Sequence, residues 1–132
     1  FKKFNDKNPL FIATQPVEII KNHDKIDFYK RLLGVEGLIE IQDGLEYVYL
    51  MLNKDSGYFK IGQSKKPTYR ERTLQSKEPE VEIVKIWNCD KKIERLLHKK
   101  FIKKKIRGEW FNLDFRDIYD LNKTIEELHN LL

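Results

Sequence analysis

Two short apolar segments near the middle of the chain are separated by polar and small residues. Residues 47–52 are aromatic and aliphatic, residues 53–57 read N-K-D-S-G, and residues 58–62 return to an apolar pattern. Aromatic and branched side chains favour strands, whereas Asn, Asp, Ser and Gly favour tight turns. The pattern therefore predicts a β-hairpin over residues 47–62, with Tyr47, Tyr49 and Met51 on one face of its first strand.

Three helices and a third strand are predicted further along the chain. One helix starts within residues 64–67, with Pro67 in its first turn, and ends near residue 76. Residues 81–87 alternate as a strand does, and Asp90 and Asp114 are expected to cap two later helices. The apolar positions of these helices are Ile93, Leu96, Leu97 and Phe101 in the first and Ile118, Leu121, Ile125, Leu128 and Leu132 in the second.

This order of elements predicts an α+β fold, with a small three-stranded, mainly antiparallel sheet flanked by helices. The pattern is weaker in residues 1–44, where we expect a helix after Asp24 that stops at Gly34, a strand over residues 37–41 and a turn at residues 43–44. We interpret residues 1–44 as an N-terminal extension of unclear role. Residues 45–132 then form the main domain, which ends in the last helix.

Composition and charge narrow the class of partner. The 132 residues carry a net charge of +5, which favours a polyanion such as nucleic acid. A lysine-rich composition that only reflects the bases of the source genome is the alternative. The single cysteine, Cys89, excludes an intramolecular disulfide and a cysteine-based zinc site, and it fits a reducing, cytoplasmic compartment. No apolar run approaches the roughly 20 residues that span a membrane, so no membrane partner is expected.

Five short motifs then stand in a recognisable order. They are Tyr47-Val48-Tyr49, Lys60-Ile61-Gly62, Arg70, E-R-L-L-H at residues 94–98 and G-E-W-F at residues 108–111. In this order they resemble the GIY-YIG nuclease superfamily, and more specifically its phage-type branch with E-x-x-L-H and G-E-W-F motifs, over about residues 45–113. Tyr47 departs from the pattern by replacing a glycine, and Lys60 departs by replacing a tyrosine.

The resemblance implies a GIY-YIG-like fold and a role for each matched residue. Tyr49 would orient or deprotonate the attacking water, and Lys60 would supply positive charge beside it or contact the phosphate. Arg70 would contact two phosphate oxygens. Glu94 would be the single carboxylate that binds Mg²⁺ or Mn²⁺, and His98, one helical turn later, is a further catalytic candidate.

Each of these residues also has a plain structural interpretation. Tyr49 could only pack the hairpin, Arg70 could be a solvated helix charge, and Glu94 could pair with Lys91 or His98. Glu109 is the alternative carboxylate for the metal, although it could instead pair with Arg107. Asn112 corresponds weakly to a late asparagine of the resembled family.

A basic run follows the E-R-L-L-H motif, and we place it at the end of the same helix. Its nucleic-acid-binding candidates are Lys103, Lys104, Lys105 and Arg107; a solvated helix face is the equally plain alternative. The function expected from the sequence is a metal-dependent endonuclease acting on DNA, with RNA left open as a substrate and the oligomeric state unspecified. The rivals are a non-catalytic DNA-binding module with the same fold and a protein-interaction domain.

Overall fold

Five strands and four α-helices form in residues 22–35 and 40–131, the part of the chain that the computed structural model describes. The strands are β1 (Tyr47–Asn53), β2 (Phe59–Ser64), β3 (Val81–Asn88), β4 (Lys105–Arg107) and β5 (Trp110–Phe111). The helices are α3 (Asn22–Leu32), α4 (Pro67–Gln75), α5 (Lys91–Lys100) and α6 (Phe115–Leu131), with a 3₁₀ turn at Ile102–Lys104. The predicted α+β class is therefore confirmed.

The sheet is larger than expected, with five strands in the order β3-β1-β2-β5-β4 and every pairing antiparallel. The prediction of three strands was wrong because β4 and β5 are too short to show an alternating pattern. They form a hairpin around Gly108, whose φ of 54° favours glycine. The basic run was also misplaced, because α5 ends at Lys100 and the later basic residues lie on the 3₁₀ turn and on β4.

The predicted hairpin of β1 and β2 is confirmed. Its pairing runs from Tyr47 opposite Ser64 to Leu52 opposite Phe59. The Asn53 side chain closes the turn by accepting hydrogen bonds from the backbone N–H groups of Asp55 and Ser56, at 2.8 and 3.1 Å. β1 lies between β2 and β3 in the sheet. Successive side chains of a strand point to opposite faces, so β1 contributes residues to both sides of the sheet.

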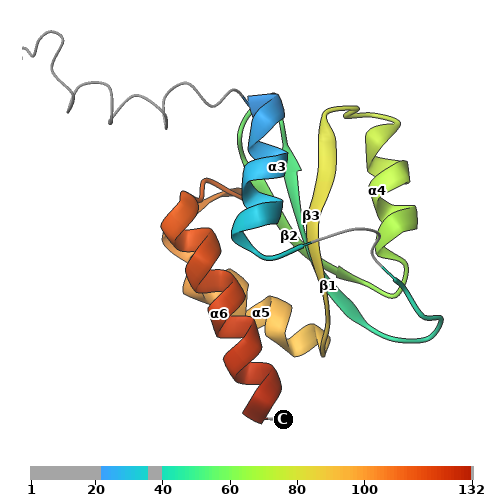
Figure 1. Cartoon of the computed structure of the whole chain (residues 1–132), viewed down its shortest axis with the longest axis vertical. Coiled ribbons are helices and arrows are strands. Elements are labelled where there is room, and N and C mark those ends of the chain that lie inside the picture. The colour runs from blue at the N-terminus through green and yellow to red at the C-terminus, as the bar shows by residue number, and fades with distance from the viewer. Residues whose placement is uncertain (1–21, 36–39, 132) are drawn as a thin grey trace, which may run out of the picture.

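Helices cover both faces of the sheet (Figure 1). On one face, Val48, Leu50 and Leu52 of β1 pack in a core with buried residues of α3, α5 and α6. On the other face, Tyr49 and Met51 pack with residues of β3 and with a partly buried leucine of α4. The two faces therefore differ: the first carries the main core, and the second leaves room between the sheet and α4.

The helix caps agree with the sequence patterns. Pro67 stands in the first turn of α4, and Asp90 accepts a hydrogen bond from the N–H of Lys92 at 2.8 Å at the start of α5. Leu96 was wrongly assigned to the apolar face of α5: it is 48% exposed, because the buried stripe repeats every four residues through Ile93, Leu97 and Phe101. No helix in the described ranges has both the length and the apolar character needed to cross a membrane.

Helix α3 precedes the main domain but joins its core. Ile26, Tyr29 and Leu33 are buried there, and the rings of Tyr29 and Phe59 meet edge to face at 5.0 Å between centroids. The helix predicted after Asp24 is present, begins at Asn22 and is followed by Gly34 with a φ of 72°. The expected turn at residues 43–44 is also present; of the strand predicted over residues 37–41, residues 37–39 lie outside the described part and residues 40–41 are not in a strand.

Candidate functional site

A cleft of about 120 Å³ opens between α4 and the sheet face that carries Tyr49. It is lined by Tyr49, Met51, Lys60, Arg70, Thr73, Leu74 and Lys77. Three of the residues singled out from the sequence, Tyr49, Lys60 and Arg70, thus meet in one place. Glu94 and His98 do not line this cleft. They lie on α5, whose buried residues pack in the core on the opposite face of the sheet.

Tyr49 reaches the floor of the cleft because of the glycine opposite it. Tyr49 pairs with Gly62 across the β1–β2 ladder. A side chain on Gly62 would overlap the ring and hydroxyl of Tyr49, so the phenol lies directly over the glycine backbone. The Lys60-Ile61-Gly62 motif therefore has a steric explanation: only glycine lets the tyrosine cross β2.

Lys60 is held in place by two partners from the β4–β5 hairpin. Its ammonium group lies 3.2 Å from the Glu109 carboxylate and 5.5 Å from the ring centre of Trp110, its cross-strand neighbour. Sequence reasoning had suggested Arg107 as the partner of Glu109; the structure pairs Glu109 with Lys60 instead. The pairing depends on a strand that the sequence did not reveal.

Arg70 on α4 and Lys77, two residues beyond the end of that helix, supply positive charge to the cleft. Arg70, Thr73 and Leu74 follow the i, i+3, i+4 spacing of one face of α4, and they line the cleft together with Lys77, which lies in the turn after the helix. Lys77 was missed in the sequence, although its spacing of seven residues from Arg70 continues the helical periodicity just past the end of α4. The cleft therefore presents three cations, of which Arg70 and Lys77 are solvent-exposed.

Tyr49 holds its proton tightly in this setting. Burial, followed by the negative charge of Glu109, raises the pKa of Tyr49 from 10.0 to about 12. The charge and hydrogen bond of Arg70 act against this rise without cancelling it. The phenol is therefore neutral near physiological pH and available as a hydrogen-bond donor.

Glu94 lies on the half of α5 that faces the edge of β2. Its side chain is only 14% exposed, and a carboxylate oxygen is 3.6 Å from Nε2 of His98. Burial raises the pKa of Glu94 above its ordinary value of 4.5; the charge of Glu109 acts in the same direction, and those of His98 and Lys60 act against it. Glu94 is thus electrostatically linked to the residues around Tyr49.

His98 connects α5 to the sheet. Its Nε2 lies 2.8 Å from the carbonyl oxygen of Ile61, and since a carbonyl only accepts, this nitrogen carries the proton and donates it. The N–H of Ile61 donates to the backbone carbonyl of Glu109 at 3.0 Å. These two contacts supply hydrogen-bond partners for the N–H and C=O of Ile61, beyond the residues of β2 that pair with β5. His98 therefore positions the helix that carries Glu94.

Glu94 offers one carboxylate to a divalent cation and is not part of a larger set of metal ligands among the described residues. Within the described residues, no group of three or more His, Cys, Asp and Glu side chains is arranged to hold a metal ion. Mg²⁺, however, commonly binds to one or two carboxylates and takes its other oxygens from water and phosphate. Glu94 supplies one such carboxylate, and a cation beside it would offset the cost of burying its charge and the repulsion from Glu109, both of which raise its pKa.

The basic run divides into residues with different surroundings. Lys104 pairs with Asp117, whereas Lys103, Lys105 and Arg107 form no ion pair among the described residues. Lys103, Lys104 and Lys105 line a separate hollow of about 370 Å³ together with Ile106, Asn112 and Asp114. Arg107 pairs with Trp110, which pairs with Lys60, so Arg107 shares the sheet face of the cleft.

Comparison with known proteins corrects the family expected from the motifs. The sequence profile of the T5orf172 domain matches residues 46–127, the span that contains β1 to β5, α4, α5 and most of α6. This is a different family from the GIY-YIG nuclease superfamily, so that assignment was wrong. Motifs of one to five residues fix a hairpin and two helices, and such a set does not distinguish families. Neither a curated protein nor a solved structure gave a significant match.

Proposed function

The chain belongs to the T5orf172 domain family, and on the chemistry of its cleft we propose that it is a metal-dependent endonuclease that hydrolyses phosphodiester bonds in DNA. The observation that carries the proposal is the meeting of Tyr49, Lys60 and Arg70 in one cleft, with two carboxylates coupled to the phenol. Burial raises the pKa values of both Tyr49 and Glu94, and perturbed pKa values are typical of catalytic sites.

The cations of the cleft suit a phosphodiester. Arg70 can donate to two phosphate oxygens at once and stabilise the additional charge of the transition state. Lys60 is restrained by Glu109 and Trp110, so that its ammonium group needs little further ordering to contact a phosphate. Lys77, just beyond the end of α4, adds positive charge to the same cleft.

The high pKa of Tyr49 supports one of the two roles expected for it. A phenol with a pKa of about 12 is a poor proton acceptor near neutral pH. We therefore assign Tyr49 the task of orienting the attacking water or a phosphate oxygen by donating a hydrogen bond. The attacking water then gives its proton to solvent or to a side chain other than Tyr49.

Glu94 is the residue proposed to hold the divalent ion, Mg²⁺ or Mn²⁺. When bound, the ion would act as a Lewis acid on the phosphate. Glu94 must be ionised for this task, and its raised pKa means that the proton competes with the ion at higher pH than for an ordinary carboxylate. Glu109 is the second candidate, although its pairing with Lys60 occupies it.

A non-catalytic DNA-binding module with the same fold is the alternative. The observation that favours it is that Tyr49 is only 1% exposed, whereas Arg70 is exposed to solvent. Binding needs only Arg70, Lys77 and Arg107, whereas cleavage also needs Tyr49 and Glu94. A protein-interaction domain would need none of these residues.

The test compares the wild type with Glu94→Gln in a plasmid-nicking assay with and without Mg²⁺ or Mn²⁺. Glu94→Gln keeps the size of the side chain and removes the charge that would hold the metal. We expect cleavage to fall by at least about two to three orders of magnitude, with DNA affinity unchanged or higher because one negative charge is lost. Glu127→Gln, a change at an exposed position on α6, is the matched control.

Two results would contradict the proposal in different ways. If Glu94→Gln cleaves at the wild-type rate, Glu94 does not hold the metal, and Glu109→Gln becomes the variant to measure. If the wild type cuts neither DNA nor RNA with either ion, the chain is a binding module. Removal of the metal with a chelator should abolish cleavage and leave binding in place.

A further inference from the structure

An exposed tyrosine on α4 lies next to the cleft but takes no part in it. Tyr69 is 59% exposed and precedes Arg70, which lines the cleft. Successive helix residues point about 100° apart, so Tyr69 lies on the solvent ridge of α4 beside the cleft. Thr73, one turn after Tyr69 on α4, lines the cleft, and its hydroxyl donates to the backbone carbonyl of Tyr69 at 2.9 Å.

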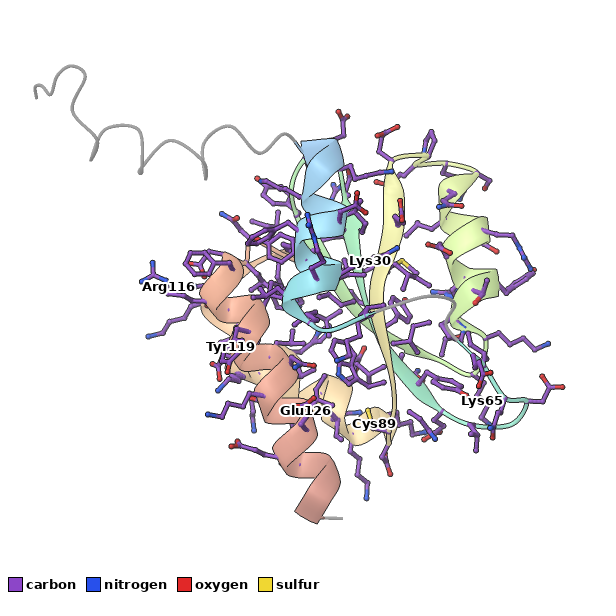
Figure 2. The ribbon with its side chains drawn as sticks, in the orientation of Figure 1. Lys30, Lys65, Cys89, Arg116, Tyr119 and Glu126 are labelled. Atoms are coloured by element: carbon purple, nitrogen blue, oxygen red, sulfur yellow. The ribbon has the colours of Figure 1, made fainter. Side chains whose placement is uncertain are left out.

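Positive charge surrounds this tyrosine. Lys65, Lys66 and Arg72 are exposed, and in the described part of the chain none of them has an ion-pair partner. Figure 2 shows Lys65 at the rim of the molecule, by the end at which α4 begins. The one carboxylate of α4, Glu71, is turned away and accepts a hydrogen bond from the N–H of Ile83 at 2.7 Å.

This charge does not serve the helix itself. The first turn of α4 has no acidic residue, and its cap position, Lys66, makes no side-chain capping bond. Cations at the start of a helix oppose the helix dipole and weaken the helix slightly. An anionic ligand therefore explains Lys65 and Lys66 better than helix stability does.

We propose that Tyr69, with Lys65, Lys66 and Arg72, binds an unpaired stretch of the DNA strand that leaves the cleft, and that one base stacks on the Tyr69 ring. This inference rests on the proposed function, because it takes the strand in the cleft to be DNA. Flat aromatic rings bind bases of any sequence and lysines follow the phosphates, the combination found in proteins that bind single strands. In a duplex the base faces are already stacked, so the exposed ring selects frayed, flapped or single-stranded DNA.

The test measures binding without cleavage. The parent protein carries Glu94→Gln and is kept free of divalent metal, and the probes are a labelled oligothymidine and a duplex of equal length. Tyr69→Ala should weaken oligothymidine binding about five- to hundredfold, the effect of losing one base–aromatic stack. Tyr69→Phe should bind as the parent does, and neither variant should change duplex affinity.

Tyr119→Ala is the matched control. Tyr119 is 55% exposed on α6, and Figure 2 shows it on the opposite side of the molecule from Lys65. We expect this variant to bind both probes as the parent does. A second variant, with Lys65 and Lys66 both changed to Gln, should have lower affinity for both probes, and its binding should depend less on salt.

Several results would overturn the inference. Unchanged oligothymidine binding by Tyr69→Ala would do so, as would an equal loss on the duplex or an equal loss in Tyr119→Ala. Displacement of oligothymidine by polyglutamate as effectively as by unlabelled oligothymidine would show a merely acidic partner. Because no cleavage is measured, a wild type that binds through Tyr69 and never cuts DNA contradicts only the proposed function.

Discussion

At the scale of single residues, Glu94 is placed where its charge is costly. Its side chain is mostly buried, and Glu109 adds negative charge close by. A carboxylate in such a place weakens the fold while it is ionised, and the usual compensation is a ligand of opposite charge. The stability of the protein should therefore report on the site without any measurement of cleavage.

We predict that Glu94→Gln makes the protein more stable at neutral pH. The folded pKa of Glu94 is raised above 4.5, so the folded state keeps the proton longer than the unfolded state as pH rises. The free energy of unfolding then falls as pH increases through the window between 4.5 and the folded pKa. Urea denaturation at a series of pH values should show an advantage of the variant that is absent in acid and grows toward neutrality.

Glu127→Gln should show no such pH-dependent gain. Adding Mg²⁺ at neutral pH should stabilise the wild type and leave Glu94→Gln unaffected, because only a site that exists in the folded state contributes linkage energy. A difference between Glu94→Gln and wild type that stays constant with pH would mean that the ionisation of Glu94 is not perturbed by folding.

At the scale of elements, the contact between α5 and β2 decides where Glu94 lies. His98 donates to the Ile61 carbonyl at an edge of β2 that β5 leaves unpaired. Its ring also packs edge to face on Phe111, with 4.9 Å between ring centroids. His98 therefore ties the helix that carries Glu94 to the strand that carries Lys60.

We predict that His98→Ala costs about 1–3 kcal/mol of stability, because the Ile61 carbonyl loses its partner. The Mg²⁺ concentration for half-maximal cleavage should rise, while the rate at saturating Mg²⁺ falls much less. Lys99→Ala, an exposed neighbour on the same helix, is the control for both measurements. A rate that saturating Mg²⁺ cannot restore would instead make His98 a catalytic residue, as the sequence motif had indicated.

The elements that the sequence predicted are those whose signals are local. β1, β2 and β3 contain enough residues to show the pattern of a strand. Asp90 and Asp114 are residues that favour a helix N-cap, and both accept capping hydrogen bonds in the structure. The signals of β4 and β5 are not local: these strands of three and two residues pair with each other, and β5 also pairs with β2, which is distant in sequence. This is also why the basic residues of β4 were assigned to a helix.

The site was predictable to the same extent. Tyr49, Lys60 and Arg70 lie on β1, β2 and α4, which were predicted from local patterns, and they line one cleft. Glu94 and His98 do not line it. The partner of Lys60 could not be predicted, because Glu109 reaches it only through the β2–β5 pairing. The family could not be predicted either, since short motifs on a common hairpin-and-helix framework do not separate one family from another.

At the scale of the whole molecule, the exposed cations are not equivalent. Arg107 shares the sheet face of the cleft, whereas Lys104 is paired with Asp117 on another part of the surface. The net charge of +5 therefore does not tell how many cations are free to contact DNA, or on which part of the surface they lie. The salt dependence of binding separates these cations experimentally.

We predict that Arg107→Gln lowers the slope of log affinity against log salt by about one unit on duplex DNA, the effect of one lost phosphate contact. Lys104→Gln should change the slope less, because Asp117 already neutralises that charge. Titrations at several salt concentrations measure both slopes. Equal effects of the two changes would show that DNA follows the whole basic run rather than the cleft face.

The fit of Tyr49 over Gly62 also limits how the protein can change during evolution. Any side chain at position 62 would meet the phenol ring, so a mutation there is harmful while the tyrosine remains. A smaller residue at position 49 would remove the obstacle but also the hydroxyl, and the glycine would then be free to vary. Chains of this family that keep a tyrosine at position 49 should therefore keep the glycine at position 62. In chains that have lost the tyrosine, position 62 should vary, so that the two positions change together across the family.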